Sequence, residues 1–295
     1  MRIETAAIIG AGPAGLATAL QLKRHGIEPL LLERDAIGGL LRNANWVENY
    51  PGFPDGISGL DLARLLAIHA RRAGIEVVYD EVQKLTFQDG VFQLTLPGGS
   101  AYSQVVVIAT GTRPNEFVDI EIPEIVRMNV LYEVHPLLGV SGKRIAIAGA
   151  GDAAFDYALN LARRNEVMIL NRGASRKCLP LLWERAMAQK NIVYHENMPV
   201  CGIERGRANV MRLLCKSQAD VGPIECNYLI GAIGRVPRLD FLSEQVRSII
   251  HDLEDKGLLY FVGDIRHGLF RQTAIAVGDG IRTGMIIYQR QKGQA

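Results

Sequence analysis

Near its start the chain passes from an apolar run through a glycine-rich turn into a segment with helical periodicity. Residues 5–9 are largely apolar and predict a buried strand. After the turn at 10–15, apolar residues recur at helical spacing over 16–23. A second apolar run, residues 29–32, predicts another strand and ends at Glu33. This order of strand, turn, helix, strand and terminal acid is typical of a dinucleotide-binding unit.

The glycines of this turn each suit contact with a pyrophosphate. Gly10 permits the tight turn, Gly12 has no side chain that would hold a pyrophosphate away, and Gly15 lets the helix pack closely on the strand. The amino end of the helix directs free N–H groups at the phosphates. Glu33 stands 23 positions after Gly10, close to where such folds place a carboxylate on a ribose hydroxyl. The segment predicts a bound dinucleotide, and a glycine-rich loop without a ligand is the alternative.

A second glycine signature, of the form G-x-G-x-x-A, begins at Gly149. The apolar residues 144–148 precede it, a helical pattern follows to about residue 164, and residues 167–170 predict the next strand. The chain is therefore expected to hold two nucleotide-binding units.

Basic residues follow the strand of this second unit. Asn171 stands 22 positions after Gly149, where a site that prefers NAD usually has an acid. Arg172, Arg176 and Lys177 come next. Positive charge at this place suits the 2′-phosphate of a ribose, which favours NADPH over NADH. A solvated basic loop is the alternative.

The remaining pattern predicts a helix over residues 59–72 and an ordered loop, rich in aromatic residues, proline and glycine, over 45–54. Short alternating runs predict a small sheet from residues 76–79, 84–87 and 91–96. Further strands are predicted at 105–109 and 258–262, and a helix begins near residue 271.

One sequence pattern occurs twice and marks the ends of domains. Residues 105–114 and 228–237 both run from an apolar strand through glycine to proline, and each follows one nucleotide signature. Such a segment ends one domain and forms a hinge to the next. We expect an α/β fold with two Rossmann-like, three-layer ββα dinucleotide-binding domains, the second inserted into the first. The first comprises residues 1–112 and 238–295, and the second comprises residues 113–237.

Composition narrows the classes of protein and of partner. Of the 295 residues, 48% are hydrophobic and 22% are charged, which is ordinary for a soluble globular protein. A net charge of +2 gives no reason to expect nucleic acid or a membrane surface as a partner, and no apolar run approaches the length of a membrane span. The first residues belong to a strand rather than to a signal peptide. We expect a cytoplasmic protein.

The four cysteines, Cys178, Cys201, Cys215 and Cys226, all fall in the inserted domain. No two of them form a Cys-x-x-Cys pair, and this usage fits a reducing compartment. Their apolar or strand-like surroundings predict buried, unreactive thiols. The six histidines are scattered without ligand spacing, so no metal site is expected.

Several short motifs occur in order along the chain: Gly10-x-Gly-Pro-Ala-Gly15, Gly38-Gly39, Val47-Glu-Asn-Tyr-Pro-Gly52, Ala109-Thr-Gly111, Gly149-x-Gly-Asp152, Ile233-Gly234, Val262-Gly-Asp264 and Arg271-Gln272. This ordered set spans nearly the whole chain. It closely resembles the low-molecular-weight thioredoxin reductases and their relatives, the thioredoxin-reductase-like ferredoxin–NADP reductases. The resemblance implies FAD on the first domain, NADPH on the inserted domain, and a homodimer.

The resemblance also implies which residues contact the two cofactors. It places the adenosine ribose of FAD at Glu33, the isoalloxazine near Asn49, and a ribityl hydroxyl where Asp264 can accept its hydrogen bond. The implied FAD contacts are Gly10, Gly12, Pro13, Ala14, Gly15, Glu33, Arg34, Gly39, Leu40, Asn49, Val82, Ala109, Thr110, Gly111, Gly263, Asp264, Arg271, Gln272 and Thr273. The NADPH contacts are Gly149, Gly151, Asp152, Ala153, Arg172, Arg176 and Lys177.

The chain departs from the thioredoxin reductases where they carry a redox-active Cys-x-x-Cys. Counted back from Gly149, those two positions hold Tyr132 and His135, and no cysteine pair follows Glu33. Without a vicinal dithiol, the flavin cannot pass electrons to a protein disulfide by thiol exchange. Residues 241–258 are also fewer than the family pattern has, so a hairpin is expected to be missing there.

These observations favour an FAD-dependent NAD(P)H oxidoreductase that passes electrons from NADPH through FAD to an external acceptor. Ferredoxin or another small redox protein, a small organic molecule and oxygen are candidate acceptors. One alternative is a reductase whose flavin acts directly on a disulfide or small-molecule substrate, and another is a flavin-binding subunit or redox sensor without turnover. His135 is a candidate proton donor at the flavin, with an interdomain surface role as its alternative.

Overall fold

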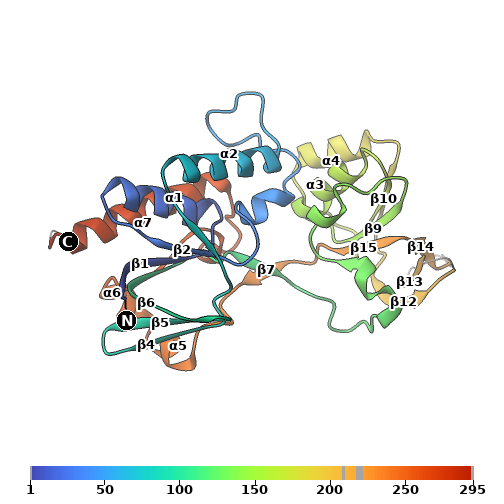
Figure 1. Cartoon of the computed structure of the whole chain (residues 1–295). Coiled ribbons are helices and arrows are strands. Elements are labelled where there is room, and N and C mark those ends of the chain that lie inside the picture. Colours follow the sequence, from blue (N-terminus) through green and yellow to red (C-terminus); the bar gives the residue numbers. More distant parts are fainter. Residues whose placement is uncertain (1, 208–209, 217–221, 294–295) are drawn as a thin grey trace. The chain divides into compact units, whose positions relative to one another are not determined.

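The chain forms two compact units, of which the computed structural model describes residues 2–207, 210–216 and 222–293 (Figure 1). Unit 1 comprises Met1–Arg42, Val47–Arg113 and Pro237–Ala295. Unit 2 comprises Asn43–Trp46 and Pro114–Val236. The segments by which the chain enters and leaves Pro114–Val236 pair as a two-stranded sheet of β7 (Thr112–Pro114) and β16 (Arg235–Pro237).

The short segment Asn43–Trp46 differs from the predicted domain division, which placed it with the first domain. The structure groups it with unit 2 because its polar groups are bonded there. Asn43 Nδ2 donates to Glu133 Oε2 (2.6 Å), and the backbone N–H of Asn45 donates to Asp156 Oδ2 (2.8 Å).

Unit 1 is built on a seven-stranded sheet whose strands are β1 (Glu4–Ile9), β2 (Leu30–Glu33), β3 (Val77–Tyr79), β4 (Lys84–Gln88), β5 (Val91–Leu96), β6 (Gly99–Ile108) and β17 (Leu259–Phe261). The order is β3-β2-β1-β6-β5-β4, with β17 also paired to β6. Residues 99–103 of β6 pair antiparallel with β5, and residues 106–108 pair parallel with β17. The long strand β6 thus joins the parallel part of the sheet to the antiparallel part.

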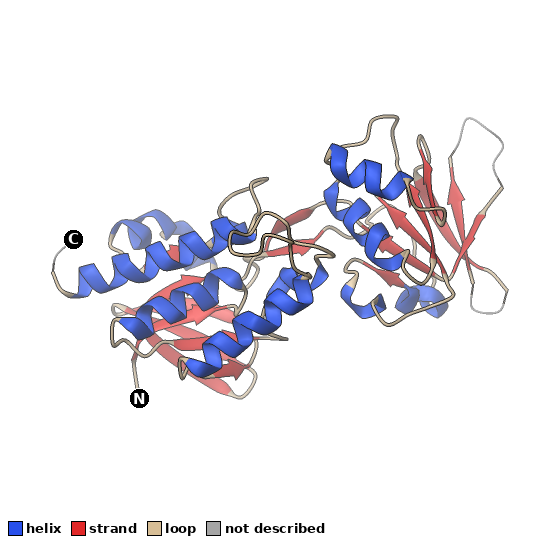
Figure 2. Cartoon of the chain, turned by 90° about the horizontal axis from the view of Figure 1, so that it is seen from above, coloured by secondary structure: helices blue, strands red, loops and turns tan. Residues whose placement is uncertain are grey.

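Each face of this sheet is covered, so unit 1 has three layers. The longer helices α1 (Pro13–Arg24), α2 (Gly59–Arg72) and α7 (Thr273–Gln291) lie over one face (Figures 1 and 2). The short helices α5 (Glu244–Ser248) and α6 (Ile250–Asp255) pack into the core on the other face. Ala6 and Ile8 of β1 pack in the core under α1, α2 and α7, whereas Ala7 and Ile9 pack in the core on the other face, with residues of α5 and α6. Because both faces of β1 are buried, its sequence is a nearly continuous apolar run.

Two glycines bring α7 close to α1. A Cβ atom on Gly280 would overlap the carbonyl oxygen of Ala14 and lie 2.9 Å from the Cβ of Ala17. A Cβ atom on Gly284 would lie 2.8 Å from the Cβ of Gln21. Because Gly280 and Gly284 are one helical turn apart, they form a smooth strip on α7 against which α1 rests.

Unit 2 repeats this layered plan. A five-stranded parallel sheet has the order β11-β10-β9-β15-β8, and a separate antiparallel sheet has the order β12-β13-β14. Ile145 and Ile147 face the helices, while Ala146 and Ala148 face the antiparallel sheet. The elements are β8 (Val130–Leu131), β9 (Arg144–Ala148), α3 (Asp152–Leu161), β10 (Glu166–Leu170), α4 (Pro180–Met187), β11 (Ile192–His195), β12 (Val200–Arg205), β13 (Met211–Cys215), β14 (Ile224–Cys226) and β15 (Tyr228–Gly231).

Two features of unit 1 differ from the sequence predictions. The prediction that residues 76–79, 84–87 and 91–96 form a small sheet together was wrong. Strand β3 pairs with β2 at one edge of the large sheet, while β4 and β5 lie at the other edge. The segment with the expected missing hairpin, residues 241–258, holds the short helices α5 and α6. Within the described residues, no helix has the length and apolar character that a membrane crossing needs.

Candidate functional site

The glycine turn of unit 1 packs so tightly that two of its positions exclude a side chain. Gly10 has φ +107°, and a Cβ atom there would lie 2.5 Å from the carbonyl oxygen of Ala109. A Cβ atom on Gly15 would overlap the carbonyl oxygen of Gly10. These contacts bring the ends of β1 and β6 against the start of α1. Glycine is required at both positions by the fold itself.

Gly12 differs, because a Cβ atom there would meet nothing within 4 Å among the described residues. Gly12 is the N-cap of α1 and supplies no side-chain cap to the N–H groups of the first turn. The Cα of Gly12 lies 3.6 Å from the position of a Cβ on Gly39, whose φ is +51°. The backbone of two glycines therefore lines an open cradle at the amino end of a helix. This geometry fits a dinucleotide pyrophosphate, which needs backbone N–H groups and close approach.

Glu33, the last residue of β2, is buried and holds the same turn. Its Oε2 accepts the backbone N–H of Ala11 (2.7 Å), and its Oε1 accepts the backbone N–H of Asp35 (2.9 Å). Each carboxylate oxygen has a further lone pair with which to accept a ribose hydroxyl. The neighbouring Arg34 forms an ion pair with Glu81 (3.7 Å), and Glu81 also binds Arg238 (2.8 Å).

The remaining FAD candidates lie at the ends of strands and at the start of α7. Ala109, Thr110 and Gly111 follow β6, and Thr110 Oγ1 donates to the carbonyl oxygen of Arg238 (2.8 Å). Val82 is buried, Leu40 is half-buried, and Pro13 and Ala14 begin α1. Asp264 lies in the 3₁₀ turn Gly263–Ile265, and Arg271, Gln272 and Thr273 lead into α7.

Asp279 of α7 supports the turn that carries Asp264, and the sequence did not single it out. Asp279 Oδ2 accepts the backbone N–H of Gly263 (3.0 Å) and lies 2.5 Å from His267 Nε2. Gly263 has φ +75°, and a Cβ atom there would lie 2.9 Å from the Cβ of Ala14. The turn is thus fixed from two sides. The sequence could not indicate this contact, because helical periodicity does not show which loop the side chain of a helical acid will contact.

The glycine turn of unit 2 repeats the geometry of the first. Gly149 has φ +136°, and a Cβ atom there would overlap the carbonyl oxygen of Ala232. At Gly151, the N-cap of α3, a Cβ atom would meet no described residue within 4 Å. Asp152 and Ala153 are exposed in the first turn of α3, and Asp152 Oδ1 accepts the backbone N–H of Leu179 (2.7 Å). This second cradle fits the pyrophosphate of a pyridine nucleotide.

The basic loop after β10 lies beside this turn. The backbone N–H of Lys177 donates to the carbonyl oxygen of Ala150 (2.8 Å), next to Gly151. The guanidinium of Arg176 lies 4.3 Å from the ring centroid of Trp183 and is held there by a cation–π contact. Arg172 is exposed and makes no hydrogen bond or ion pair with any residue that the structure describes.

Asn171, where a site that prefers NAD has an acid, is buried and structural. Its Nδ2 donates to the hydroxyl of Tyr194 (2.8 Å) and to the carbonyl oxygen of Ser175 (3.2 Å). Its Oδ1 accepts the backbone N–H of Gly173 (3.2 Å). These three hydrogen bonds connect the basic loop to Tyr194 of β11 and fix the conformation of the loop. No carboxylate stands at this position to repel a 2′-phosphate.

The position of the missing dithiol is a packed corner of unit 2. The hydroxyl of Tyr132 accepts the backbone N–H of Phe117 (3.0 Å), and burial raises the pKa of this tyrosine. Glu133 pairs with Arg235 (2.8 Å), and the backbone N–H of His135 donates to Asn43 Oδ1 (3.0 Å). Residues 132–135 are therefore held by their own contacts, with the His135 side chain half-buried.

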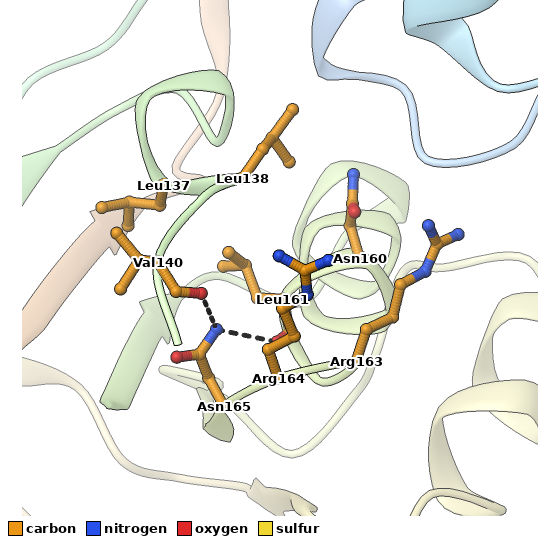
Figure 3. Close-up of a pocket in the computed structure, with 8 residues that line it drawn as sticks. All are labelled: Leu137, Leu138, Val140, Asn160, Leu161, Arg163, Arg164 and Asn165. Atoms are coloured by element: carbon orange, nitrogen blue, oxygen red, sulfur yellow. Dashed lines mark hydrogen bonds between the residues drawn. The ribbon is translucent and has the colours of Figure 1, made fainter. Parts of the chain in front are cut away.

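A small cavity of about 100 Å³ lies at the carboxyl end of α3 (Figure 3). Asn165 lines it and donates to the carbonyl oxygens of Val140 (2.9 Å) and Leu161 (3.0 Å). The cavity is too small for a nicotinamide nucleotide, and it lies at the other end of α3 from Gly151. It is not the predicted cofactor site. The other lining residues are Leu137, Leu138, Asn160, Arg163 and Arg164.

Comparisons with known proteins agree with this geometry. The model of a family described as pyridine nucleotide-disulphide oxidoreductase matches residues 4–280. A thioredoxin reductase of Treponema pallidum is 28% identical, over 92% of this chain and 92% of its own length. The solved thioredoxin reductase of Lactococcus lactis has a TM-score of 0.83 at 24% identity and covers 97% of this chain and 98% of its own.

A more distant solved relative is the bacillithiol disulfide reductase of Bacillus cereus, with a TM-score of 0.73 at 19% identity over 98% of this chain and all of its own. These structures share the architecture of two Rossmann-like domains, so the predicted fold class is confirmed. The family match likewise confirms the resemblance drawn from the ordered motifs.

Proposed function

The chain belongs to the pyridine nucleotide-disulphide oxidoreductase family, and on that premise we propose that it delivers electrons from NADPH to an acceptor outside the chain, without a redox-active disulfide of its own. Enzymes of this family bind FAD and NAD(P)H. The observation that carries the proposal is the corner at Tyr132–His135. The side chains there that replace two thiols are Tyr132, which is half-buried and packs against Phe117, and His135. No electron relay through this position is available to the chain.

Unit 1 is proposed to hold FAD. The open cradle at Gly12 and Gly39 takes the pyrophosphate, and Glu33 takes the ribose hydroxyls through its free lone pairs. The turn at Asp264 and the start of α7 at Gln272 are the candidate contacts of the ribityl chain and the ring. Bound FAD would supply the hydride-accepting and electron-donating chemistry, and the residues named here bind and orient it.

Unit 2 is proposed to hold NADPH. The pyrophosphate fits the cradle at Gly151, and the 2′-phosphate fits the basic loop beside it. Arg172 is the best placed of the three cations to donate to a phosphate, because it is exposed and has no partner among the described residues. Arg176, stacked on Trp183, and Lys177 add positive charge.

We assign the acceptor to small redox proteins of the ferredoxin kind, and the assembly to a homodimer. A second candidate function is a direct reductase of a disulfide substrate. The chain shares its fold with the bacillithiol disulfide reductase named above. A flavin that reduces a disulfide substrate directly needs no dithiol at residues 132–135. The two functions differ in the acceptor and can be separated by assay.

His135 is proposed as a proton donor to the acceptor or the reduced cofactor. Its backbone N–H donates to Asn43, and its imidazole is a titratable group at the position of the second thiol. A pH–rate profile of reoxidation should lose an ionisation in His135→Gln. If the profiles and rates of the two proteins coincide, His135 has no part in proton transfer.

The test of the proposed function is an acceptor screen on the purified, FAD-loaded chain. NADPH oxidation is followed with ferredoxin, a low-molecular-weight disulfide, a dye and oxygen. The triple variant Cys178→Ser, Cys201→Ser and Cys215→Ser leaves only the buried Cys226 and can form no internal disulfide. It should retain the rate of the parent chain. Loss of activity in this variant, while FAD stays bound, would show that thiols carry the electrons. No NADPH oxidation with any acceptor would favour a subunit without turnover.

A further inference from the structure

Three of the four cysteines lie in the small antiparallel sheet of unit 2. Cys201 is in β12, Cys215 ends β13, and Cys226 ends β14. The sequence predicted buried thiols, and the structure corrects this for Cys201, which is exposed, and for Cys215 and Cys178, which are partly exposed. Only Cys226 is buried. This sheet is distinct from the parallel sheet of unit 2, whose strand β9 leads into the glycine turn at Gly149.

The pleat of the sheet places Cys201 and Cys215 on one face. On β13, Leu213 points into the core, so Cys215, two residues further, points the same way and packs against the same cluster. On β12, Ile203 points into this core as well. Cys201 stands two residues before Ile203 and is therefore expected on that face.

The strand register brings these two cysteines opposite each other. Ile203 pairs with Leu213 and Gly202 with Leu214, and the next step of this register is Cys201 with Cys215. A β-bulge interrupts the ladder there and pairs Val200 with Cys215. In a bulge, two residues of one strand oppose a single residue of the other. Both Val200 and Cys201 thus face Cys215.

One hydrogen-bonded carbonyl fixes the place of the Cys201 sulfur. Cys201 Sγ donates to the carbonyl oxygen of Pro199 (3.4 Å). The same oxygen accepts the backbone N–H of Lys216 (3.2 Å), the residue next to Cys215. The thiol therefore lies at the point where β12 meets the end of β13. Directly opposed residues have Cα atoms about 4.5–5.5 Å apart, which is within the span that a disulfide bridges.

We propose that Cys201 and Cys215 are a cross-strand dithiol that a hydroperoxide converts reversibly into a disulfide. The proposal does not rest on the proposed electron transfer, because the oxidant is the hydroperoxide and no flavin takes part. It gives the chain a thiol site of its own, carried by β12 and β13 and not by residues 132–135.

The exposed thiol is the one that meets the oxidant. The Cys201 thiolate attacks one peroxide oxygen, so that an S–O bond forms, the O–O bond breaks, and water or an alcohol leaves. Cys215 sulfur then attacks the Cys201 sulfenic acid, the S–S bond forms, and hydroxide leaves with the thiol proton as water. The two thiols together lose two electrons, and the peroxide gains them.

The surroundings of Cys215 make it a poor first target for the peroxide. Burial, followed by the nearby Cys201, raises the pKa of the Cys215 thiol to about 11. Cys215 is therefore protonated at neutral pH, so the peroxide reacts first with Cys201, and Cys215 must lose its proton as it attacks the sulfenic sulfur held beside it. Cys226 is a weaker candidate still, because burial raises its pKa further and its side chain lies in the core.

The test uses hydrogen peroxide on the folded, full-length chain. After a stoichiometric dose, the chain is unfolded in a thiol-blocking reagent, digested, and analysed by mass spectrometry. We expect the loss of two of the four free thiols and one linked peptide pair that joins Cys201 to Cys215. A thiol reductant should restore both. The linked pair is sought in the unaltered chain, so the result does not depend on the folding of a variant.

Three variants assign the roles. Cys201→Ser should retain all its remaining thiols at the same dose, and Cys215→Ser should accumulate a sulfenic acid at Cys201 that dimedone captures. Cys178→Ser, a partly exposed cysteine outside this sheet, should behave like the parent chain. Four unreacted thiols in the parent, a bridge between another pair or between two chains, or sulfinic acid at Cys201 in place of a bridge would each overturn the proposal.

Discussion

Asn49 Nδ2 donates a hydrogen bond to Gln272 Oε1 at 2.8 Å, joining a loop near the start of the chain to the residue that caps α7. Both side chains are exposed, and 223 positions separate them in the sequence. The resemblance had assigned both residues to the flavin ring independently. Their contact makes them one polar group on the surface of unit 1.

We expect this pair to act on FAD affinity rather than on folding. Gln272→Ala and Asn49→Ala should each weaken FAD binding by roughly 2- to 10-fold, the value of one hydrogen bond of about 0.5–1.5 kcal/mol. The double variant should lose less than the sum, because the two side chains share one bond. Titration of apoprotein with FAD measures this. Equal and additive stability losses without a change in affinity would contradict it.

The glycine turn offers a matched pair of variants. Gly12→Ala has room for its methyl group and a φ of −72° that alanine adopts readily, so the apoprotein should keep its melting temperature and lose FAD binding. Gly15→Ala drives its methyl group into the backbone of Gly10 and should lower both. Calorimetry and FAD titration of the two proteins separate the roles. A Gly12→Ala protein that binds FAD normally would refute the cradle.

Arg172 should determine the preference for NADPH. A charged hydrogen bond contributes about 1.5–3 kcal/mol, so Arg172→Ala should lose roughly 10- to 150-fold in kcat/KM with NADPH and little with NADH. Arg127→Ala removes an exposed arginine of the same unit that pairs with Glu124, and it serves as the control. Equal losses with both nucleotides would assign Arg172 a structural role.

Asp156 should make the stability of unit 2 depend on pH. Burial, opposed by the backbone N–H of Asn45 and by Arg163, raises its pKa from 3.8 to about 6. The folded state then binds a proton more tightly than the unfolded state, so this group adds stability as pH falls through 6, with the gain complete below about 4. Ionised Asp156 therefore costs stability at pH 8.

Asp156→Asn should consequently raise the free energy of unfolding at pH 8 by about 1–3 kcal/mol and flatten its slope between pH 7 and 4. The same exchange at the exposed Asp119 should change neither quantity. Denaturant unfolding at several pH values provides the measurement. A variant that is less stable than the parent at pH 8 would show that the carboxylate charge is needed.

The helix α7 should tolerate a methyl group at one glycine and not at another. Gly280→Ala places a Cβ atom against the backbone of Ala14 and should destabilise the chain by about 1–3 kcal/mol. Gly278→Ala meets no described residue within 4 Å and should stabilise the helix by about 0.5–1 kcal/mol. Melting temperatures should therefore shift in opposite directions. A loss at both positions would mean that a surface of α7 near Gly278 is also packed.

Local sequence signals predicted helices well where an N-cap residue precedes a stretch with helical periodicity. The helix expected over 59–72 is α2 (Gly59–Arg72), and Ser58 caps it by accepting the backbone N–H of Asp61 (3.1 Å). The two glycine turns were also predicted, because a backbone with no room for a side chain leaves glycine in the sequence. In these places the sequence and the structure express the same steric constraint.

Pairing between distant segments could not be predicted in the same way. The alternating pattern of residues 76–79 identified a strand but not its neighbour, since any open sheet edge can accept it. Strand register determines the hydrogen bond between Asn171 and Tyr194. It also determines the β-bulge that places Cys201 opposite Cys215. A register is set by the whole sheet, so no window of sequence contains it.

The pairing of β17 with β6 has a consequence for how the protein is made. Residues 106–108 of β6 are all apolar and pair with β17 in the folded protein. The ribosome synthesises β17 only after the whole of Pro114–Val236. Until then the nascent chain presents an unpaired, hydrophobic strand edge, the kind of surface that chaperones cover. Gln272 and Asp264 emerge later still. Biosynthesis therefore sets an order in which unit 2 can fold during translation, whereas the proposed FAD site of unit 1 is complete only near the end of synthesis.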